Sequence, residues 1–325
     1  MRAAPADLAA VCRRMRSERR AALAVHVNPD TDAVGAAAGM LDLFSQLGVE
    51  AVVHAAEDVR VPLEAYLLPA DSVVRGLPDA GTPLYALDCG SLSRVALPFD
   101  RWEGFVVNID HHRDNTGFGD LILLRVEASS TCEIVCDIAR ALALDPGPQA
   151  AAALYAGLSF DSGHFRHSNT TARTFACAAW LRELGVDVTA VHKRLYEQRS
   201  QGALRLWARV VTAAEAEADG RLMVATVTLH DYAVTGAHED ETEGILETLR
   251  AVAGVEAAVL VKEQSEGARV RVSLRSGDLD VSAIAALRGG GGHRLAAGFS
   301  SDDSPKEVTA WLSSELARRL STVSC

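Results

Sequence analysis

Carboxylate and imidazole side chains gather at three places in the first half of the chain, each at the end of a short apolar run. They are His26, Asp30 and Asp32 at the first place, Asp88 at the second, and Asp110, His111 and His112 at the third. A further acid, Asp161, follows an apolar helical pattern. These side chains bind divalent cations, and carboxylates gathered without a cation would repel one another. Two ions about 3.5–4 Å apart can activate a water molecule and stabilise a phosphoryl transition state.

The elements that position these residues alternate between strands and helices. The expected strands are 22–27, 51–54, 83–88 and 105–109, and the expected helices are 33–47, 131–143 and 149–158. This alternation predicts an α/β fold with a mostly parallel sheet covered on both faces. Ligands of such sheets gather outside the carboxyl ends of the strands, which is where the acidic segments fall.

Each of these residues also has an ordinary structural explanation. A single aspartate after a strand is commonly a helix cap, so Asp30 or Asp32 could cap the helix that follows. A single histidine is more often structural than a metal ligand. The joint occurrence favours the metal site, because four separate segments deliver such side chains to one edge of the sheet.

The pattern changes after residue 185, which predicts a first domain over 1–185. Residues 186–215 are predicted to form a helical linker, and 216–325 a second, smaller α/β domain. The strands expected in the second domain are 222–229, 257–262 and 269–275, and its helices 242–252, 281–287 and 305–320. We expect the active site in a cleft between the two domains.

A pattern typical of anion binding lies in the second domain. Gly289, Gly290, Gly291 and Gly292 directly precede His293. Consecutive glycines let backbone amides turn toward an anion, although such a run is equally typical of a flexible turn. Upstream, Arg269, Arg271 and Arg275 alternate with apolar residues, which places them on one face of a strand. Arg275 is the better phosphate candidate, whereas a solvated strand face accounts equally well for Arg269 and Arg271.

The composition narrows the class of protein. With 325 residues, 49% hydrophobic and 23% charged, the chain is long and apolar enough for two folded domains. A formal net charge of −11 argues against binding long duplex nucleic acid, which favours a basic protein face. The six cysteines include no CxxC pair, which disfavours a zinc site. Neither a signal peptide nor a stretch of about 18 apolar residues is recognisable, so we expect a cytoplasmic protein.

In combination, the motifs resemble those of a known family. The segments His26-x3-Asp30-x-Asp32, Asp88, Asp110-His111-His112 and Asp161 are similar, in order, to the four motifs of the DHH phosphoesterase superfamily. Gly290–His293 and the following Ala296-Ala297-Gly298 resemble the signature of the DHH-associated C-terminal domain. Chain length, Ser129-Ser130-Thr131-x-Glu133 and segment 161–171 are most similar to the compact branch that degrades nanoRNA and dephosphorylates 3′-phosphoadenosine 5′-phosphate (pAp).

The resemblance implies a role for each residue. The implied ligands of one ion are His26, Asp30 and Asp88. Those of the other are Asp32, Asp88, His111 and Asp161, so Asp88 bridges the two. His112 would face the substrate phosphate as electrophile or proton donor, and Asp110 would orient the histidines. The implied binding site for the nucleotide's terminal phosphate is Arg275 and His293 with Gly290, Gly291 and Gly292.

The expected function is therefore a two-metal phosphoesterase with Mn²⁺ as its ions, and Mg²⁺ or Co²⁺ as substitutes. Its substrates would be short RNA, linear dinucleotides such as pApA, or pAp, and its products nucleoside monophosphates. The alternatives are an inorganic pyrophosphatase or polyphosphatase, and a nucleotide sensor that binds without cleaving. The resemblance also implies a homodimer.

Overall fold

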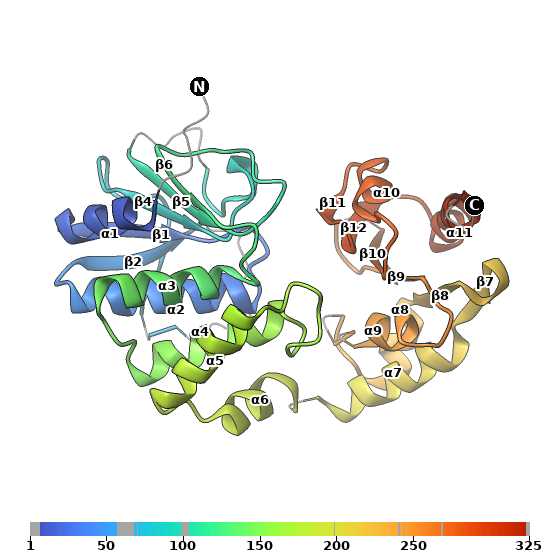
Figure 1. Cartoon of the computed structure of the whole chain (residues 1–325). Helices are drawn as coiled ribbons and strands as arrows, with labels where there is room; N and C mark the ends of the chain where they lie inside the picture. The colour runs from blue at the N-terminus through green and yellow to red at the C-terminus, as the bar shows by residue number, and fades with distance from the viewer. Residues whose placement is uncertain are drawn as a thin grey trace. The chain divides into compact units, whose positions relative to one another are not determined.

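The chain divides into two compact units in a computed structural model (Figure 1). The first unit spans Met1–Glu197 and the second Gln198–Cys325. The residues that the structure describes are 7–56, 68–69, 71–98, 104–197, 199–239, 241–242, 244–267 and 269–322. Within these ranges, no helix combines the length and apolar character needed to cross a membrane.

The first unit is built on a six-stranded sheet in which every described pair of strands is parallel. Its strands are β1 (Arg20–Ala24), β2 (Glu50–Ala55), β3 (Val73–Arg75), β4 (Leu84–Leu87), β5 (Val106–Asp110) and β6 (Leu121–Leu124). They lie in the order β3-β2-β1-β4-β5-β6. The order reverses between β1 and β4, and in open α/β sheets ligands bind where this reversal opens a crevice.

Helices cover one face of this sheet. The helices of the first unit are α1 (Leu8–Ser17), α2 (Thr31–Gln46), α3 (Thr131–Leu142), α4 (Pro148–Asp161), α5 (Ala172–Glu183) and α6 (Val188–Tyr196). In Figure 1, α2 and α3 run along the sheet, and their apolar residues share one core with alternate strand residues such as Leu23, Tyr85 and Ile109. The opposite face is also buried, but among the described residues loop segments around Val95 and Leu97 cover it, not helices. The predicted parallel sheet is therefore correct, with helical cover on one side.

The packing of α2 against α4 depends on glycine. A β-carbon on Gly35 would lie 2.5 Å from the Ala153 carbonyl oxygen, and one on Gly157 would lie 2.4 Å from the Cys132 sulfur. Neither distance is compatible with an added methyl group, so these glycines allow the helices to approach closely. The start of α2 and the end of α4, which carry Asp32 and Asp161, are thereby held near one another.

The second unit has its own six-stranded, mixed sheet. Its strands are β7 (Glu215–Glu217), β8 (Leu222–Val227), β9 (Ala257–Glu263), β10 (Val270–Ser276), β11 (Gly291–His293) and β12 (Ala296–Ser301), in the order β11-β12-β10-β9-β8-β7. The helices are α7 (Gln201–Ala213), α8 (Leu229–Thr235), α9 (Ile245–Arg250), α10 (Ser282–Ala286) and α11 (Pro305–Thr322). Only the β8–β9 pair is parallel among these described strands.

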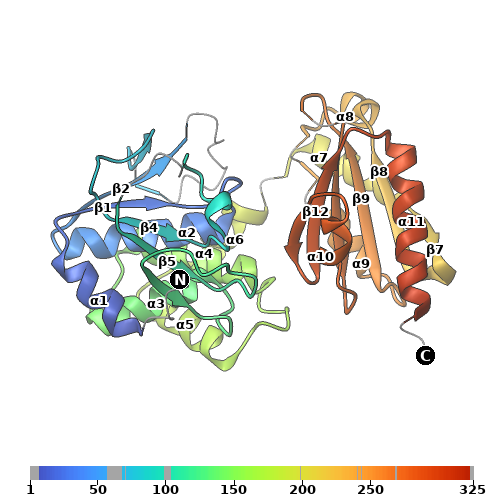
Figure 2. The same ribbon diagram turned by 90° about the horizontal axis from the view of Figure 1, so that it is seen from above.

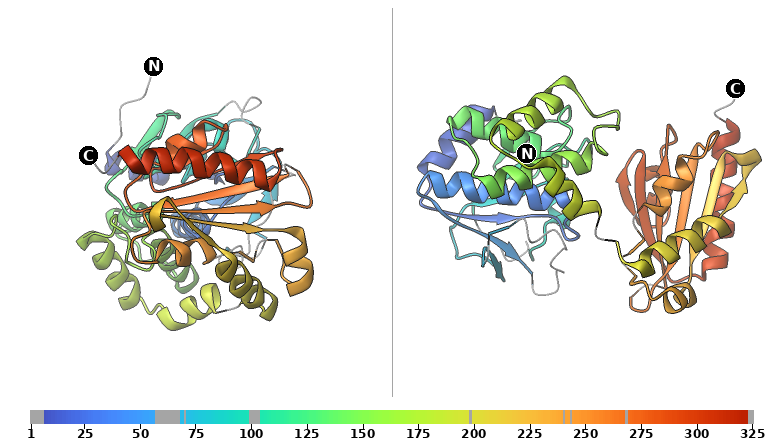
Figure 3. Two further views of the ribbon diagram at one scale, coloured as in Figure 1. Left: turned by 90° about the vertical axis from the view of Figure 1, so that its right-hand side faces the viewer. Right: turned by 90° about the horizontal axis from the view of Figure 1, so that it is seen from below.

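Both faces of the second sheet carry helices. Val259 and Val261 of β9 share a core with α11, while the alternate residues Ala258 and Leu260 share a core with α7, α8 and α9. Figure 2 shows α11 along the strands, and the left panel of Figure 3 shows α11 and α7 on opposite sides of them. The expected second α/β domain is thus present.

The segment predicted as a helical linker contains two separate helices. Helix α6 belongs to the first unit and α7 to the second, and the division between units falls between them. The exact limits 1–185, 186–215 and 216–325 stay a prediction.

Candidate metal centre

The candidate ligands of the first unit meet where the strand order reverses. His26 follows β1, and Asp88 directly follows β4, its neighbour in the sheet. The chain around His26 leaves the sheet to form an isolated bridge with Val95. The ring of His26 lies beside the Asp88 carboxylate.

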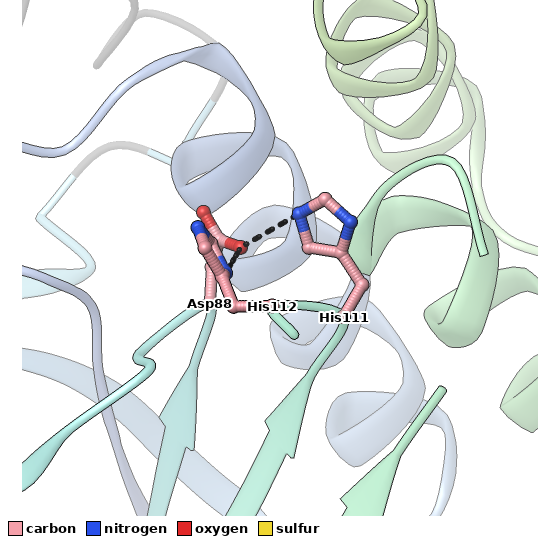
Figure 4. Close-up of side chains that lie close together, drawn as sticks. All are labelled: Asp88, His111 and His112. Atoms are coloured by element: carbon pink, nitrogen blue, oxygen red, sulfur yellow. Dashed lines mark ion pairs between the residues drawn. The ribbon is translucent and has the colours of Figure 1, made fainter. Parts of the chain in front are cut away.

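Asp88 is surrounded by three imidazole rings. Its carboxylate oxygens lie 3.6 Å from His26 Nε2, 3.5 Å from His111 Nε2 and 3.5 Å from His112 Nδ1. Figure 4 shows both adjacent histidines, which follow β5, turned toward this carboxylate. Asp88 also has a left-handed backbone (φ 58°), a conformation that Asp and Asn adopt more readily than most residues. This geometry suits the predicted bridging ligand.

The remaining acids complete two groups around this centre. His26, Asp30 and Asp88 place their ligand atoms within 4.8 Å of one another, and so do Asp32, His111 and Asp161. Asp161 Oδ2 lies 3.1 Å from His111 Nε2. The structure therefore brings together all six predicted metal ligands.

One of these aspartates is a helix cap, and another accepts hydrogen bonds from the start of a different helix. Asp30 is the N-cap of α2, and its Oδ1 accepts hydrogen bonds from the amides of Asp32 (3.0 Å) and Ala33 (3.1 Å). Asp32 is fully buried and accepts hydrogen bonds from the first two amides of α3. The capping and metal-binding explanations are thus compatible, since each carboxylate has further acceptor positions.

Asp110 lies behind the histidines. Its Oδ1 accepts hydrogen bonds from His112 Nδ1 (2.7 Å) and from the His111 amide (2.8 Å). Its Oδ2 accepts one from Asn115 Nδ2, a residue that the sequence patterns did not single out. The His111 ring instead faces the Ala128 carbonyl oxygen, 3.4 Å from Nδ1. Asp110 therefore fixes the ring of His112 but only the backbone of His111.

Two carboxyl groups of the cluster have raised pKa values. Burial raises the pKa of Asp32 well above its usual range, and the nearby carboxylates of Asp161 and Asp88 raise it further. Burial, together with repulsion from Asp30 and Asp88, raises the pKa of Asp161 to about 6 against the opposing hydrogen bond to His111. These carboxyls resist ionising side by side.

The carboxylates favour the charged form of the neighbouring histidines, and the histidines favour the charged form of Asp88. Burial alone would lower the pKa of His26, but its contacts with Asp30 and Asp88 outweigh burial and raise that pKa to about 9. Burial would likewise raise the pKa of Asp88, but His26, His111 and His112 outweigh it and hold that pKa well below its usual range. The imidazoles and carboxylates thus favour one another's charged forms, and divalent cations can take over the role of the imidazoles toward the carboxylates.

The donor set fits divalent cations. Carboxylate oxygens and imidazole nitrogens suit Mn²⁺ and similar ions, and His26 Nε2 faces the carboxylates of both Asp30 and Asp88. No cysteine belongs to any of the three groups of potential ligands found in the described chain.

The second unit brings its predicted residues together differently. Arg275 of β10 pairs with Ala296 of β12, and Ala296 pairs in turn with His293 of β11, so the three share one row of the sheet. Half of the glycine run is strand and not turn, because Gly291 and Gly292 are part of β11. Arg275 Nε lies 3.4 Å from Glu247 Oε1 of α9, so a phosphate there would compete with a carboxylate.

Comparison with known proteins explains this two-part architecture. Residues 21–158 match the model of the DHH family, N-terminal domain, and residues 219–321 match the DHHA1 domain. The bifunctional oligoribonuclease and PAP phosphatase NrnA of Thermus thermophilus is 34% identical over 85% of this chain and 82% of its own length. The chain belongs to the DHH family, in the NrnA-like branch.

A second curated relative agrees with this placement, and a solved structure shares the fold. The probable NrnA of Streptococcus mutans is 29% identical over 85% of this chain and 87% of its own length. An exopolyphosphatase-related protein from Bacteroides fragilis shares the fold, with a TM-score of 0.85, 20% identity and coverage of 95% of this chain and 94% of that one. The resemblance noted from the four DHH motifs is confirmed.

The motifs did not reveal every residue that supports the DHH centre. Thr131 and Asn169 lie in segments that resemble the branch, but the patterns gave them no role. Thr131 donates a hydrogen bond to Asp88, and Asn169 donates one to the backbone of Asp161. The only sequence signal for these two residues was their position next to a motif, because the spacing of residues along the chain does not show which distant segments make contact.

Proposed function

We propose that this protein is a two-metal phosphoesterase that hydrolyses short oligoribonucleotides, linear dinucleotides such as pApA, or pAp to nucleoside monophosphates. The observation that carries the proposal is the Asp88 carboxylate, which lies within 3.6 Å of three histidines and belongs to two of the three potential ligand groups. The substrate class follows from the NrnA relatives, whose names record oligoribonuclease and PAP phosphatase activities.

The residues divide into two ligand sets. One ion would be held by His26, Asp30 and Asp88, and the other by Asp32, Asp88, His111 and Asp161. Mn²⁺ is the ion that we propose, and when bound the two ions supply positive charge that activates a water molecule and stabilises the developing phosphoryl charge.

His112 performs the proton transfer in this proposal. Its Nδ1 is held by Asp110 at 2.7 Å, which fixes the ring and stabilises its protonated form. Its contacts with Asp110 and Asp88 outweigh burial, which alone would lower its pKa, and raise that pKa above the usual value. A protonated ring can donate a hydrogen bond to a phosphate oxygen and then pass the proton to the leaving oxygen.

Substrate length would be set by the second unit. Arg275 and His293, with the amides of Gly290, Gly291 and Gly292, would bind the terminal phosphate, because a guanidinium offers paired donors to phosphate oxygens. Recognition of one chain end would favour short substrates, which agrees with the net charge of −11.

Chromatographic product analysis tests the function directly. Purified protein with Mn²⁺ is incubated separately with pAp, pApA, a five-nucleotide RNA and pyrophosphate. We expect nucleoside monophosphates from at least one of the first three substrates and no loss of pyrophosphate. Phosphate from pyrophosphate alone would replace the proposal with a pyrophosphatase, and binding of pAp without turnover would replace it with a nucleotide sensor.

Arg275→Ala is expected to raise KM for pAp or pApA by roughly 10–100-fold while kcat changes little. The reason is the loss of a charge-assisted phosphate contact, worth about 1.5–3 kcal/mol, that is similar in the ground state and the transition state. Steady-state kinetics measures both constants. Arg271→Ala is the matched control, since Arg271 lies four residues earlier in β10 on the same face of the strand. Equal effects of the two substitutions would contradict a specific phosphate site.

The remaining parts of the proposal rest on the DHH relationship. We propose a homodimer, which light scattering coupled to size-exclusion chromatography would test. Activity titrations with Mn²⁺, Mg²⁺ and Co²⁺ on metal-stripped protein would establish which ion supports turnover best.

A further inference from the structure

The start of α3 contacts two of the six candidate metal ligands, Asp32 and Asp88. Both oxygens of Asp32 accept hydrogen bonds from the first amides of α3, from Thr131 N at 2.7 Å and Cys132 N at 3.0 Å. The Thr131 hydroxyl donates to Asp88 Oδ1 at 2.9 Å. A single residue, Thr131, therefore holds one carboxylate through its amide and another through its side chain.

The loop before α3 extends this support to two further ligands. The Ala128 carbonyl oxygen lies 3.4 Å from His111 Nδ1. Asn169 Nδ2 donates to the Ser129 carbonyl oxygen (3.0 Å) and to the Asp161 carbonyl oxygen (3.1 Å), and so ties the end of α4 to the same loop.

Glu133 holds this loop in place. Its Oε2 accepts hydrogen bonds from Ser129 N (3.2 Å) and Ser129 Oγ (2.7 Å), and from Thr174 Oγ1 of α5 (3.0 Å). The side chains of residues 129–131 are fully buried and Glu133 is 2% exposed. A buried carboxylate with several donors is costly to disturb, so the loop has one well-defined conformation.

We propose that residues 128–133 form the common support of the metal centre and that Thr131 is its central positioning residue. This inference rests on the proposed metal function of Asp32, Asp88, His111 and Asp161. The Thr131 hydroxyl directs one lone pair of Asp88 toward itself, which leaves the rest of the carboxylate turned toward the histidines. Without that hydrogen bond the carboxylate could rotate away from the geometry that a shared ligand needs.

The test compares Mn²⁺ binding by wild type, Thr131→Val, Thr131→Ser and Thr235→Val after metal removal. Calorimetry gives affinity and stoichiometry, and electron paramagnetic resonance of bound Mn²⁺ reports its ligand field. Valine keeps the shape of threonine but removes the hydroxyl, and serine keeps the hydroxyl. Thr235 is a matched control in the second unit, since its buried hydroxyl donates to the Asp231 carbonyl oxygen at 2.7 Å.

We expect Thr131→Val to weaken Mn²⁺ binding by about 10–100-fold, as is typical when a residue that orients a ligand is lost. Thr131→Ser should retain most of the affinity, and Thr235→Val should match wild type. Activity of Thr131→Val should recover as Mn²⁺ is raised, which a purely structural defect would not allow. Wild-type affinity in Thr131→Val, or equal loss in Thr131→Ser, would overturn the inference.

The experiment remains decisive if Thr131→Val does not fold, and also if wild type binds no Mn²⁺. If Thr131→Val does not fold, Asn169→Asp decides the question, because this isosteric change at a partly exposed position turns the donor to Ser129 and Asp161 into an acceptor. Weaker Mn²⁺ binding by Asn169→Asp would support the inference, and unchanged binding would overturn it. If wild type itself binds no Mn²⁺, the proposed metal centre fails, and not merely the role of Thr131.

Discussion

Asp88→Asn is expected to reduce hydrolysis of pAp and short RNA by about 10⁴-fold, a loss typical of removing a central catalytic group. The substitution removes the charge that three histidines share and one anionic ligand from both proposed ions. Asparagine is the sharper choice than alanine, because Asp88 has φ 58° and asparagine tolerates this left-handed backbone. The folded backbone should therefore survive while the ligand is lost.

The measurement for Asp88→Asn combines kcat/KM at saturating Mn²⁺ with calorimetric stoichiometry. Added Mn²⁺ should raise the unfolding temperature of wild type, since a ligand that binds only the folded state stabilises it, and should do so far less in the variant. Asp219→Asn is the matched control, with the same backbone conformation (φ 57°) in the second unit. Activity within tenfold of wild type would remove Asp88 from the centre of the mechanism.

Gly157→Ala is expected to destabilise the protein by about 1–3 kcal/mol and to weaken binding of the ion assigned to Asp32 and Asp161. The new β-carbon would lie 2.4 Å from the Cys132 sulfur and 2.9 Å from the Asp32 α-carbon. Because Asp32 is fully buried and bonded to α3, it cannot yield without shifting a ligand. Chemical unfolding and Mn²⁺ calorimetry measure the two effects.

A matched control and a double variant sharpen the Gly157 experiment. Gly277→Ala places its β-carbon in open space and should change neither property. Adding Cys132→Ala to Gly157→Ala removes the sulfur contact but leaves the Asp32 contact, so stability should recover in part while Mn²⁺ binding stays impaired. A Gly157→Ala variant with wild-type stability and binding would show that α2 and α4 have room to move apart.

The sequence patterns predicted that the candidate ligands lie close together, because these residues follow the strongest signals in the chain. Buried strands leave apolar runs, and acids directly after such runs must lie at one edge of a parallel sheet. The boundaries were less accurate. The expected strand 22–27 ends at Ala24, because the chain turns off to form the bridge at His26, and α2 begins at Thr31, because Asp30 caps it.

Other features had no signal of their own. Strands β3 and β6 have three and four residues, too few to show a period, and they exist because a neighbouring strand offers hydrogen bonds. No helix was predicted over α5, and the predicted helical linker missed the break between α6 and α7, since continuous helical patterns do not show where packing ends a helix. The hydrogen bonds that Asp32 accepts from the first amides of α3 likewise join segments that are distant in the sequence.

The parallel sheet of the first unit has a consequence for the order in which the protein folds. Parallel strands need long crossovers, so the chain must complete β1, β4 and β5 before the segments around His26, Asp88 and His111 can meet. Asp161 arrives later still, at the end of α4. During synthesis the full set of six candidate ligands is therefore complete only once α4 has formed. Divalent ions would join after assembly and act mainly by slowing the unfolding of the finished sheet.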